Sequence, residues 1–349
     1  MFLIPLHDLL ISDLSLAMKD LISKVGSADA LGKYLRELNT YPIKVAQPGD
    51  PPDVAASDSS RVIRRLSIAT LYAVQAVSLK ASLKNPSTSK LIVDSLAGYY
   101  MLTDEAVPDE LLDRIIQLIS KVLEVRSVTK VLDGCDIALF DGSLISFLWG
   151  YSNRDIPRGF YPATYKKIRD IWYEVFSGIT KVSKNVKPLF ISKRLMKNYY
   201  VDEILSNEAP KKVRDSVNDL ILISALRRVG KLPKVPYILH PVYVERSKLP
   251  QPLAELDIDI SPLTPITVTY VSFNPTLQPY QVSIPGRLGI DELVDIISSI
   301  YPYSQGGYPD PLKIAHSKCK LSNVEFRLML YKLGLSSIPT GRELLGEFL

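Results

Sequence analysis

The chain of 349 residues has a mass of 39.0 kDa, which is enough for one elaborate domain or for two domains with a large core. Its hydrophobic content of 46% and charged content of 23% are those of an ordinary globular protein, and its net charge of +5 suits a polyanionic partner without requiring one. Only two cysteines occur, Cys135 and Cys319, so a disulfide scaffold and a zinc ribbon are excluded and a reducing cytoplasm is the expected compartment.

The N-terminal segment predicts two helices. Apolar residues recur at helical spacing over residues 8–38, and Gly26 interrupts the pattern. The apolar start from Met1 to Leu6 lacks the basic lead of a signal peptide, and no apolar stretch approaches the roughly 20 residues of a membrane span. We therefore expect an N-terminal helical segment at 1–45 and a soluble, cytoplasmic protein.

Three strands are predicted after this segment. Residues 53–58 form a short apolar run, residues 66–79 are rich in Ala, Val, Ile and Tyr, and residues 90–101 suit a third strand. Turn-forming Ser and Asn-Pro segments separate the three runs. We therefore expect an antiparallel meander.

Helices and strands alternate in the rest of the chain. Pro108 opens an amphipathic helix that runs through Lys130, and a strand then ends at Asp141. The elements predicted further along are a helix at 161–184, a strand at 186–192, a helix at 211–229, strands at 235–244, 265–274 and 278–285, and helices at 289–300, 310–320 and 322–333.

This order of elements predicts an α/β fold with a ribonuclease-H-like core. Strands that are first antiparallel and then joined by helical crossovers form a mixed, centrally placed sheet flanked by helices. We expect the core to span residues 53–334, with N-terminal and C-terminal helical additions and a tail at 335–349.

Two acidic residues stand at the ends of predicted strands, each followed by small residues. Asp58 follows the run Val54-Ala55-Ala56-Ser57, and Asp141 follows Ile137-Ala138-Leu139-Phe140. An Asp at the end of a buried strand is held rigidly and still reaches solvent, as a metal ligand must. Glu124 lies on the helix between them, so the three carboxylates could converge on a two-metal site for phosphodiester hydrolysis.

Each of these residues also has an ordinary structural interpretation. A lone Glu124 on a helix is commonly a solvated side chain, and an Asp141 before Gly-Ser often only begins a turn. The metal interpretation gains weight because the three residues fall where a single fold would bring them together.

His316 is a further candidate, in the second turn of a helix opened by prolines. A neutral imidazole can complete a carboxylate site or act in proton transfer. The other two histidines, His7 and His240, lie in a terminal helix and in a Pro-flanked strand and are expected to be structural.

Basic residues follow two of the predicted strands. Lys193 and Arg194 come after the strand at 186–192, and Arg61 and Arg64 come just after Asp58. These charges either form a solvated face or contact DNA, with Lys193 placed to neutralise charge at a phosphate.

Taken together, these motifs resemble the NurA nuclease family. The matching features are Asp58 with its small followers, Glu124 on its helix, Asp141-Gly142-Ser143-Leu144, the segment Phe190 to Arg194, and Gly307-Tyr308-Pro309 leading to His316. Ser59 departs from the family, which commonly has Gly after the first Asp.

The resemblance implies a ribonuclease-H-like fold, a toroidal homodimer and manganese-dependent cleavage of DNA, with Mg²⁺ as an alternative ion. It implies metal binding at Asp58, Glu124, Asp141 and His316, and catalytic roles that extend to Lys193 and Tyr308. It also implies 5′–3′ exonuclease and single-strand endonuclease activity in DNA end resection for double-strand break repair, with a HerA-type hexameric translocase as partner.

Two other functions stay open on the sequence alone. The chain could be a non-catalytic DNA-binding or scaffold subunit of a translocase complex, although an intact set of four ligands argues against this. It could also be another ribonuclease-H-like nuclease, for example one that cleaves RNA.

The N-terminal apolar cluster of Phe2, Leu3 and Ile4 carries more apolar surface than a terminal helix usually leaves exposed. It is expected to dock on its own subunit, on a second subunit or on the translocase.

Overall fold

The computed structural model describes residues 34–44, 51–66, 69–84, 89–101, 109–149, 162–193, 198–248 and 259–333. The segment predicted to be helical at 1–45 lies mostly outside this part of the chain, and its described residues 34–44 contain the short strand β1 (Thr40–Pro42) and no α-helix. The predicted tail at 335–349 and Arg194 also lie outside the described residues. Within it, no helix is both long and apolar enough to cross a membrane.

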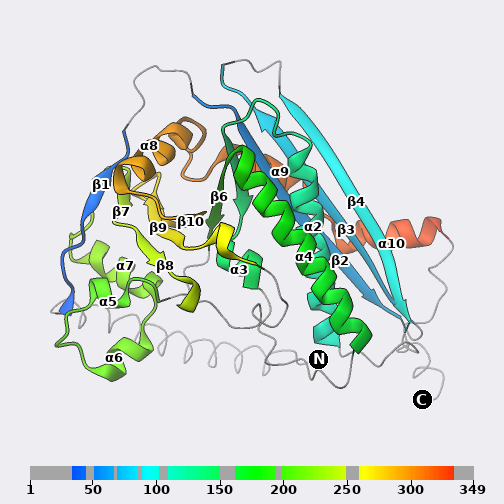
Figure 1. Ribbon diagram of the computed structural model, residues 1–349, viewed down its shortest axis with the longest axis horizontal. Coiled ribbons are helices and arrows are strands. Elements are labelled where there is room, and N and C mark those ends of the chain that lie inside the picture. Colours follow the sequence, from blue (N-terminus) through cyan, green and yellow to red (C-terminus); the bar gives the residue numbers. More distant parts are fainter. Residues whose placement is uncertain are drawn as a thin grey trace, which may run out of the picture.

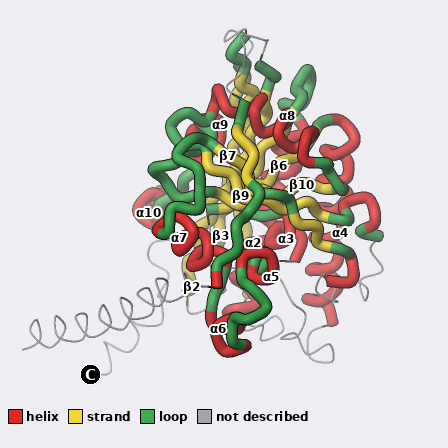
Figure 2. Tube along the Cα trace, turned by 90° about the vertical axis from the view of Figure 1, so that its left-hand side faces the viewer, coloured by secondary structure: helices red, strands yellow, loops and turns green. Residues whose placement is uncertain are grey.

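A ten-stranded mixed sheet forms the centre of the molecule, with helices on both faces (Figures 1 and 2). The strands are β1 (Thr40–Pro42), β2 (Val54–Arg65), β3 (Ala69–Ala81), β4 (Lys90–Met101), β5 (Ile137–Asp141), β6 (Lys187–Ser192), β7 (Tyr237–Leu239), β8 (Val242–Val244), β9 (Ile266–Ser272) and β10 (Tyr280–Pro285). They lie in the order β1-β7-β9-β10-β6-β5-β2-β3-β4, and β8 pairs with β9.

The helices among the described residues are α2 (Asp109–Thr129), α3 (Leu144–Trp149), α4 (Pro162–Asn185), α5 (Val201–Ile204), α6 (Lys211–Ser216), α7 (Asp219–Arg228), α8 (Ile290–Ile300), α9 (Asp310–Cys319) and α10 (Asn323–Lys332). Short 3₁₀ helices are also present at Arg246–Lys248, Ser261–Leu263 and Tyr301–Tyr303.

The strand order β4-β3-β2-β5-β6 confirms the predicted core arrangement. The first three strands in the chain form an antiparallel meander, and β5 and β6 then add in parallel beside β2. The connections from β4 to β5 and from β5 to β6 carry α2 and α4, as parallel pairing requires. The mixed sheet flanked by helices is therefore the α/β fold that the pattern indicated.

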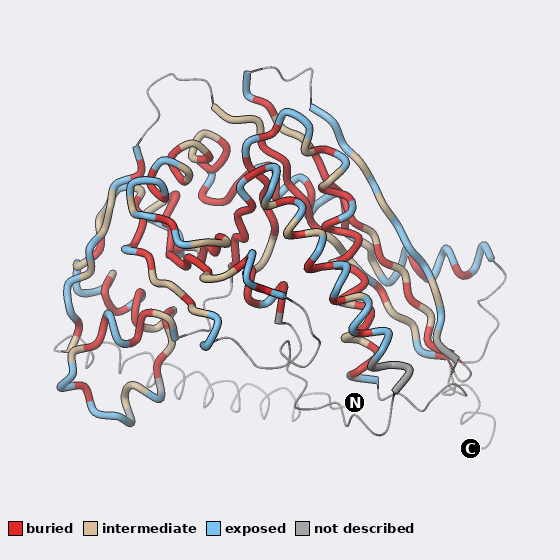
Figure 3. Tube along the Cα trace, in the orientation of Figure 1, coloured by how far each residue is buried: buried red, intermediate tan, exposed pale blue. Residues whose placement is uncertain are grey.

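Neighbouring residues of β2 enter two different cores, because side chains alternate across a sheet. Ala55 packs in the apolar cluster that contains α2, α3 and α4, whereas Val54 and Ala56 pack in the cluster that contains α8 and α9. The sheet is buried on both faces at this point (Figure 3). Further along β2, Val62 contacts Phe326 of α10 on the same face as Val54.

The strand that carries Asp58 is longer than predicted. It was expected to end at residue 58, but β2 continues to Arg65, since β3 pairs with it along its whole length. The parallel partner β5 stops earlier, and its last pair with β2 is Ser57 with Phe140. Asp58 is thus not the end of its strand; it is the first residue past the parallel pairing.

Two further predictions differ from the structure, and one helix was missed. The single helix expected at 211–229 is two helices, because Val217 is extended and the Asn218 side chain accepts the Ile221 amide to start α7. The single strand expected at 235–244 is divided into β7 and β8, which His240 and Pro241 separate. The short helix α3 was not predicted.

Candidate metal centre

Asp58 lies on the face of β2 that is covered by α9. The residue is 6% exposed, and its two carboxylate oxygens have different partners. The Ser59 amide donates to Oδ1 at 2.8 Å, and Nδ1 of His316 lies 2.7 Å from Oδ2. The carboxylate is therefore oriented by its own strand and by a helix more than 250 residues away in sequence.

His316 reaches this carboxylate because α9 packs across β2. The helix begins at Asp310, just after Pro309, and buries Leu312 and Ala315 against the sheet. The side chain of His316 is 61% exposed, so the imidazole touches Asp58 and still faces solvent. His240, which was expected to be structural, is not part of this site; its Nδ1 contacts the Tyr41 hydroxyl.

Asp141 is the last residue of β5, the strand that pairs in parallel with β2. Gly142 follows it with φ of 119°, a conformation that favours glycine, and turns the chain away from the strand. Oδ2 of Asp141 lies 2.8 Å from Nζ of Lys193, which follows β6.

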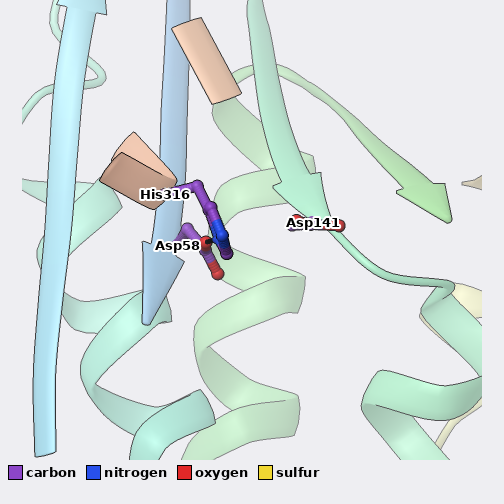
Figure 4. Close-up of side chains that lie close together, drawn as sticks. All are labelled: Asp58, Asp141 and His316. Atoms are coloured by element: carbon purple, nitrogen blue, oxygen red, sulfur yellow. Dashed lines mark hydrogen bonds and ion pairs between the residues drawn. The ribbon is translucent and has the colours of Figure 1, made fainter. Parts of the chain in front are cut away.

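Asp58, Asp141 and His316 come together as a possible metal-binding group. Each offers one ligand atom, and the three atoms all lie within 4.8 Å of one another. Figure 4 shows Asp58 beside the imidazole of His316, with Asp141 to their right at the end of β5. Two predicted ligands from strands and one from a helix thus meet at a single point.

Glu124 lies apart from these three and is fully buried on α2. Its Oε2 accepts the Ser59 hydroxyl and the Lys121 ammonium, each at 2.9 Å. Its Oε1 is buried without a hydrogen-bond partner among the described residues. Burial raises the pKa of Glu124 to about 7, against the opposing charge of Lys121 and together with the like charge of Asp58.

Lys193 and Tyr308 lie next to each other at the Asp141 side of the site. The Lys193 ammonium stands 4.4 Å from the centre of the Tyr308 ring. Tyr308 is buried, and burial together with the nearby charge of Asp141 raises the pKa of its phenol.

The predicted DNA-binding arginines of β2 lie on opposite faces of the strand. Arg61 is exposed on the face of Ser59, whereas Arg64 is half-buried on the face of Asp58, two residues past Val62. Arg64 lines a groove of about 350 Å³ with Phe326 and Arg327 of α10. The two arginines therefore do not line one surface.

Sequence reasoning missed two contacts of this site. Lys121 stands one turn before Glu124, a spacing that predicts a helical ion pair, and this signal was available. The hydroxyl of Ser59 was noticed only as a departure from the family, and its contact with Glu124 could not be predicted because α2 and β2 are far apart in sequence.

The donor set fits a hard divalent cation. Carboxylate oxygens are the ligands that Mn²⁺ and Mg²⁺ prefer, and Mn²⁺ also accepts an imidazole. The buried, unpartnered Oε1 of Glu124 is the kind of atom that a bound cation would satisfy.

Comparison with known proteins identifies relatives of this chain. An uncharacterized protein of Methanocaldococcus jannaschii is 34% identical over 97 residues, a match that covers 25% of this chain and only 23% of that protein. The crystal structure of the NurA nuclease from Sulfolobus solfataricus has a TM-score of 0.62 at 18% identity, covering 95% of this chain and 97% of that one.

Two further crystal structures share the fold. NurA with manganese has a TM-score of 0.57 at 14% identity, covering 92% of this chain and 97% of that one. NurA bound to dAMP and manganese has a TM-score of 0.55 at 15% identity, covering 93% and 96%. A model of the NurA domain matches residues 52–321, which is most of the sequence, and the chain therefore belongs to the NurA family.

Proposed function

We propose that this chain is a metal-dependent deoxyribonuclease. The observation that carries the proposal is the meeting of Asp58, Asp141 and His316, from β2, β5 and α9, with ligand atoms within 4.8 Å of one another. The related NurA structures that contain manganese and dAMP support Mn²⁺ as the cation, with Mg²⁺ as an alternative, and DNA as the substrate.

Asp58, Asp141, His316 and Glu124 are the residues that would hold the cations; Glu124, on α2, stands apart from the other three. When bound, a pair of such ions supplies an activated water and charge neutralisation at the leaving oxygen. We assign four ligands because their donor chemistry suits this role and because Glu124 has a buried oxygen with no other partner among the described residues.

Among the described residues, Lys193 is placed to act on the substrate. Its side chain is 46% exposed, and the Asp141 carboxylate and the Tyr308 ring hold its ammonium beside the proposed ligands. An ammonium fixed at this position would neutralise charge that develops on a phosphate. Tyr308 would then act by holding Lys193 and by keeping water from that side of the site.

Incubation of the purified protein with end-labelled DNA and RNA tests the proposal directly. We expect cleavage of DNA with Mn²⁺ and none with EDTA. DNA binding without cleavage under every metal condition would favour the non-catalytic scaffold function, and preferential cleavage of RNA would favour another ribonuclease-H-like activity.

We further propose, from the family resemblance, 5′–3′ exonuclease and single-strand endonuclease activity in DNA end resection. The same resemblance supports a homodimer that works with a HerA-type hexameric translocase in double-strand break repair. Substrates labelled at one end test the polarity, and light scattering and pull-down of a HerA-type protein test the assembly.

A further inference from the structure

Ser59 touches the two proposed carboxylate ligands of β2 and α2 at once. Its backbone amide donates to Oδ1 of Asp58 at 2.8 Å, and its hydroxyl donates to Oε2 of Glu124 at 2.9 Å. These contacts lie on opposite sides of the strand, because Asp58 faces α9 and Ser59 faces α2. The amide contact depends only on the backbone, whereas the hydroxyl contact is specific to the side chain.

Without the Ser59 hydroxyl, the Glu124 carboxylate would be held only by Lys121. Lys121 donates to the same Oε2 at 2.9 Å, and its ammonium lies 4.3 Å from the centre of the Phe147 ring. Phe147 is itself fixed by edge contacts with Phe140 and Phe190. Lys121, held between α2 and α3, therefore donates to Glu124 from the helical side, and Ser59 donates to the same oxygen from the sheet.

Two donors on one oxygen restrict the rotation of the Glu124 carboxylate. Because the residue is completely buried, no water competes for these bonds, and a hydrogen bond in such surroundings is strong. Oε1 is left without a partner among the described residues. In this arrangement Oε2 is held by two donors, and Oε1 is the oxygen of Glu124 that a cation would bind.

We propose that Ser59 is a positioning residue whose hydroxyl orients Glu124 for cation binding. This inference rests on the proposed metal-dependent function of the same site. Hydrogen bonds to metal-binding side chains commonly change metal affinity by 10- to 100-fold. A half-buried serine at the middle of a strand, with no role in the apolar core, is well suited to this task.

The test measures Mn²⁺ affinity by isothermal titration calorimetry, without DNA, on the full chain. Ser59→Ala removes the hydroxyl, and Ser59→Thr keeps a hydroxyl on a side chain that suits a strand. Ser60→Ala is the matched control, because it makes the same change one residue further along, where the hydroxyl accepts the Leu321 amide instead.

We expect Ser59→Ala to weaken Mn²⁺ binding by roughly 10-fold, Ser59→Thr to restore most of the affinity, and Ser60→Ala to change it by less than about 2-fold. The melting temperatures of the metal-free Ser59→Ala and Ser60→Ala variants should be similar. If the unchanged protein binds Mn²⁺ and the two variants bind it with equal affinity, the role of Ser59 is overturned but the proposed function is not. Absence of Mn²⁺ binding in the unchanged protein would instead overturn the proposed function and this inference with it.

Discussion

The carboxylates of Asp58 and Asp141 are the side chains on which the proposed chemistry depends most. Replacing either with Ala should lower the rate of DNA cleavage by roughly 100-fold or more, because a cation held there supplies several kcal/mol of charge stabilisation. Cleavage rates with Mn²⁺, together with thermal melting to confirm folding, measure the effect. Asp215→Ala, at an exposed position of α6, is the control and should keep full activity. Near-normal cleavage by the Asp141 variant would refute the assignment.

Glu124 should make the stability of the metal-free protein depend on pH. Its pKa is raised from 4.5 to about 7 by burial, so the folded state holds the proton more tightly than the unfolded state. The stabilisation is complete below pH 4.5 and is lost as the pH rises through about 7, an effect on the order of 3 kcal/mol. Chemical denaturation between pH 4.5 and 8 measures it. Glu124→Gln should flatten this dependence; an equal slope in the variant would contradict the raised pKa.

The same proton affects metal binding with the opposite sign. A carboxylate must lose its proton to bind a cation, so Mn²⁺ affinity should increase as the pH rises from 6 to 8. Titration calorimetry in buffers of different ionisation enthalpy measures the proton released on binding. Mn²⁺ binding that is independent of pH over this range would show that Glu124 does not bind the ion in its charged form.

The residues themselves were easier to find in the sequence than their contacts. Asp58 and Asp141 stand next to apolar runs, and His316 stands in a helix after prolines, so local pattern was sufficient to select them. Neither the contact of His316 with Asp58 nor that of Ser59 with Glu124 follows from local pattern. Both contacts join residues more than 60 positions apart, and the packing of α9 and α2 on the sheet creates them.

At the level of single elements, the alternation of side chains along β2 determines which arginine shares a face with Asp58. Arg64 shares the face of Asp58 and lies about 20 Å further along the strand, whereas Arg61 lies on the face of Ser59. If DNA lies along the face of β2 that carries Asp58, Arg64→Ala should weaken DNA binding. The salt dependence of the DNA binding constant should then decrease by about the equivalent of one phosphate contact. Arg61→Ala should have the smaller effect. Binding measured at several salt concentrations compares them, and a larger loss for Arg61→Ala would place the DNA on the opposite face.

Element boundaries were predictable where one strong signal marked them. Pro108 and Pro309 precede α2 and α9, and the third strand predicted at 90–101 is observed as β4. The end of β2 was misplaced because its second half has polar residues on both faces, and only the pairing with β3 keeps it extended to Arg65. The break between α6 and α7 was missed because Asn218, which caps α7, stands in a sequence with continuous helical periodicity.

For the whole molecule, the chain order of strands and helices was enough to predict the central sheet. A meander followed by helical crossovers has few ways to form a single sheet, because parallel neighbours need long connections and antiparallel neighbours do not. The other half of the sheet, β7, β9 and β10 with β1 at its edge, was not placed in advance. Its short strands are ordered by contacts between distant segments, for example between Thr40 and Leu239.

Assembly is the largest scale at which the proposed function can be tested. The segment with Phe2, Leu3 and Ile4 lies outside the described residues, so the expectation rests on its composition: three large apolar residues close to a chain terminus need a surface to cover them. We predict a homodimer in solution, and that replacing the three with Ser weakens the dimer or the binding of a HerA-type translocase. Light scattering gives the mass, and pull-down gives the translocase binding. Mn²⁺ affinity should remain unchanged, because the proposed ligands lie on β2, β5, α2 and α9, and it serves as the control for folding. If the variant keeps both its dimer mass and its translocase binding, the apolar segment packs only against its own subunit.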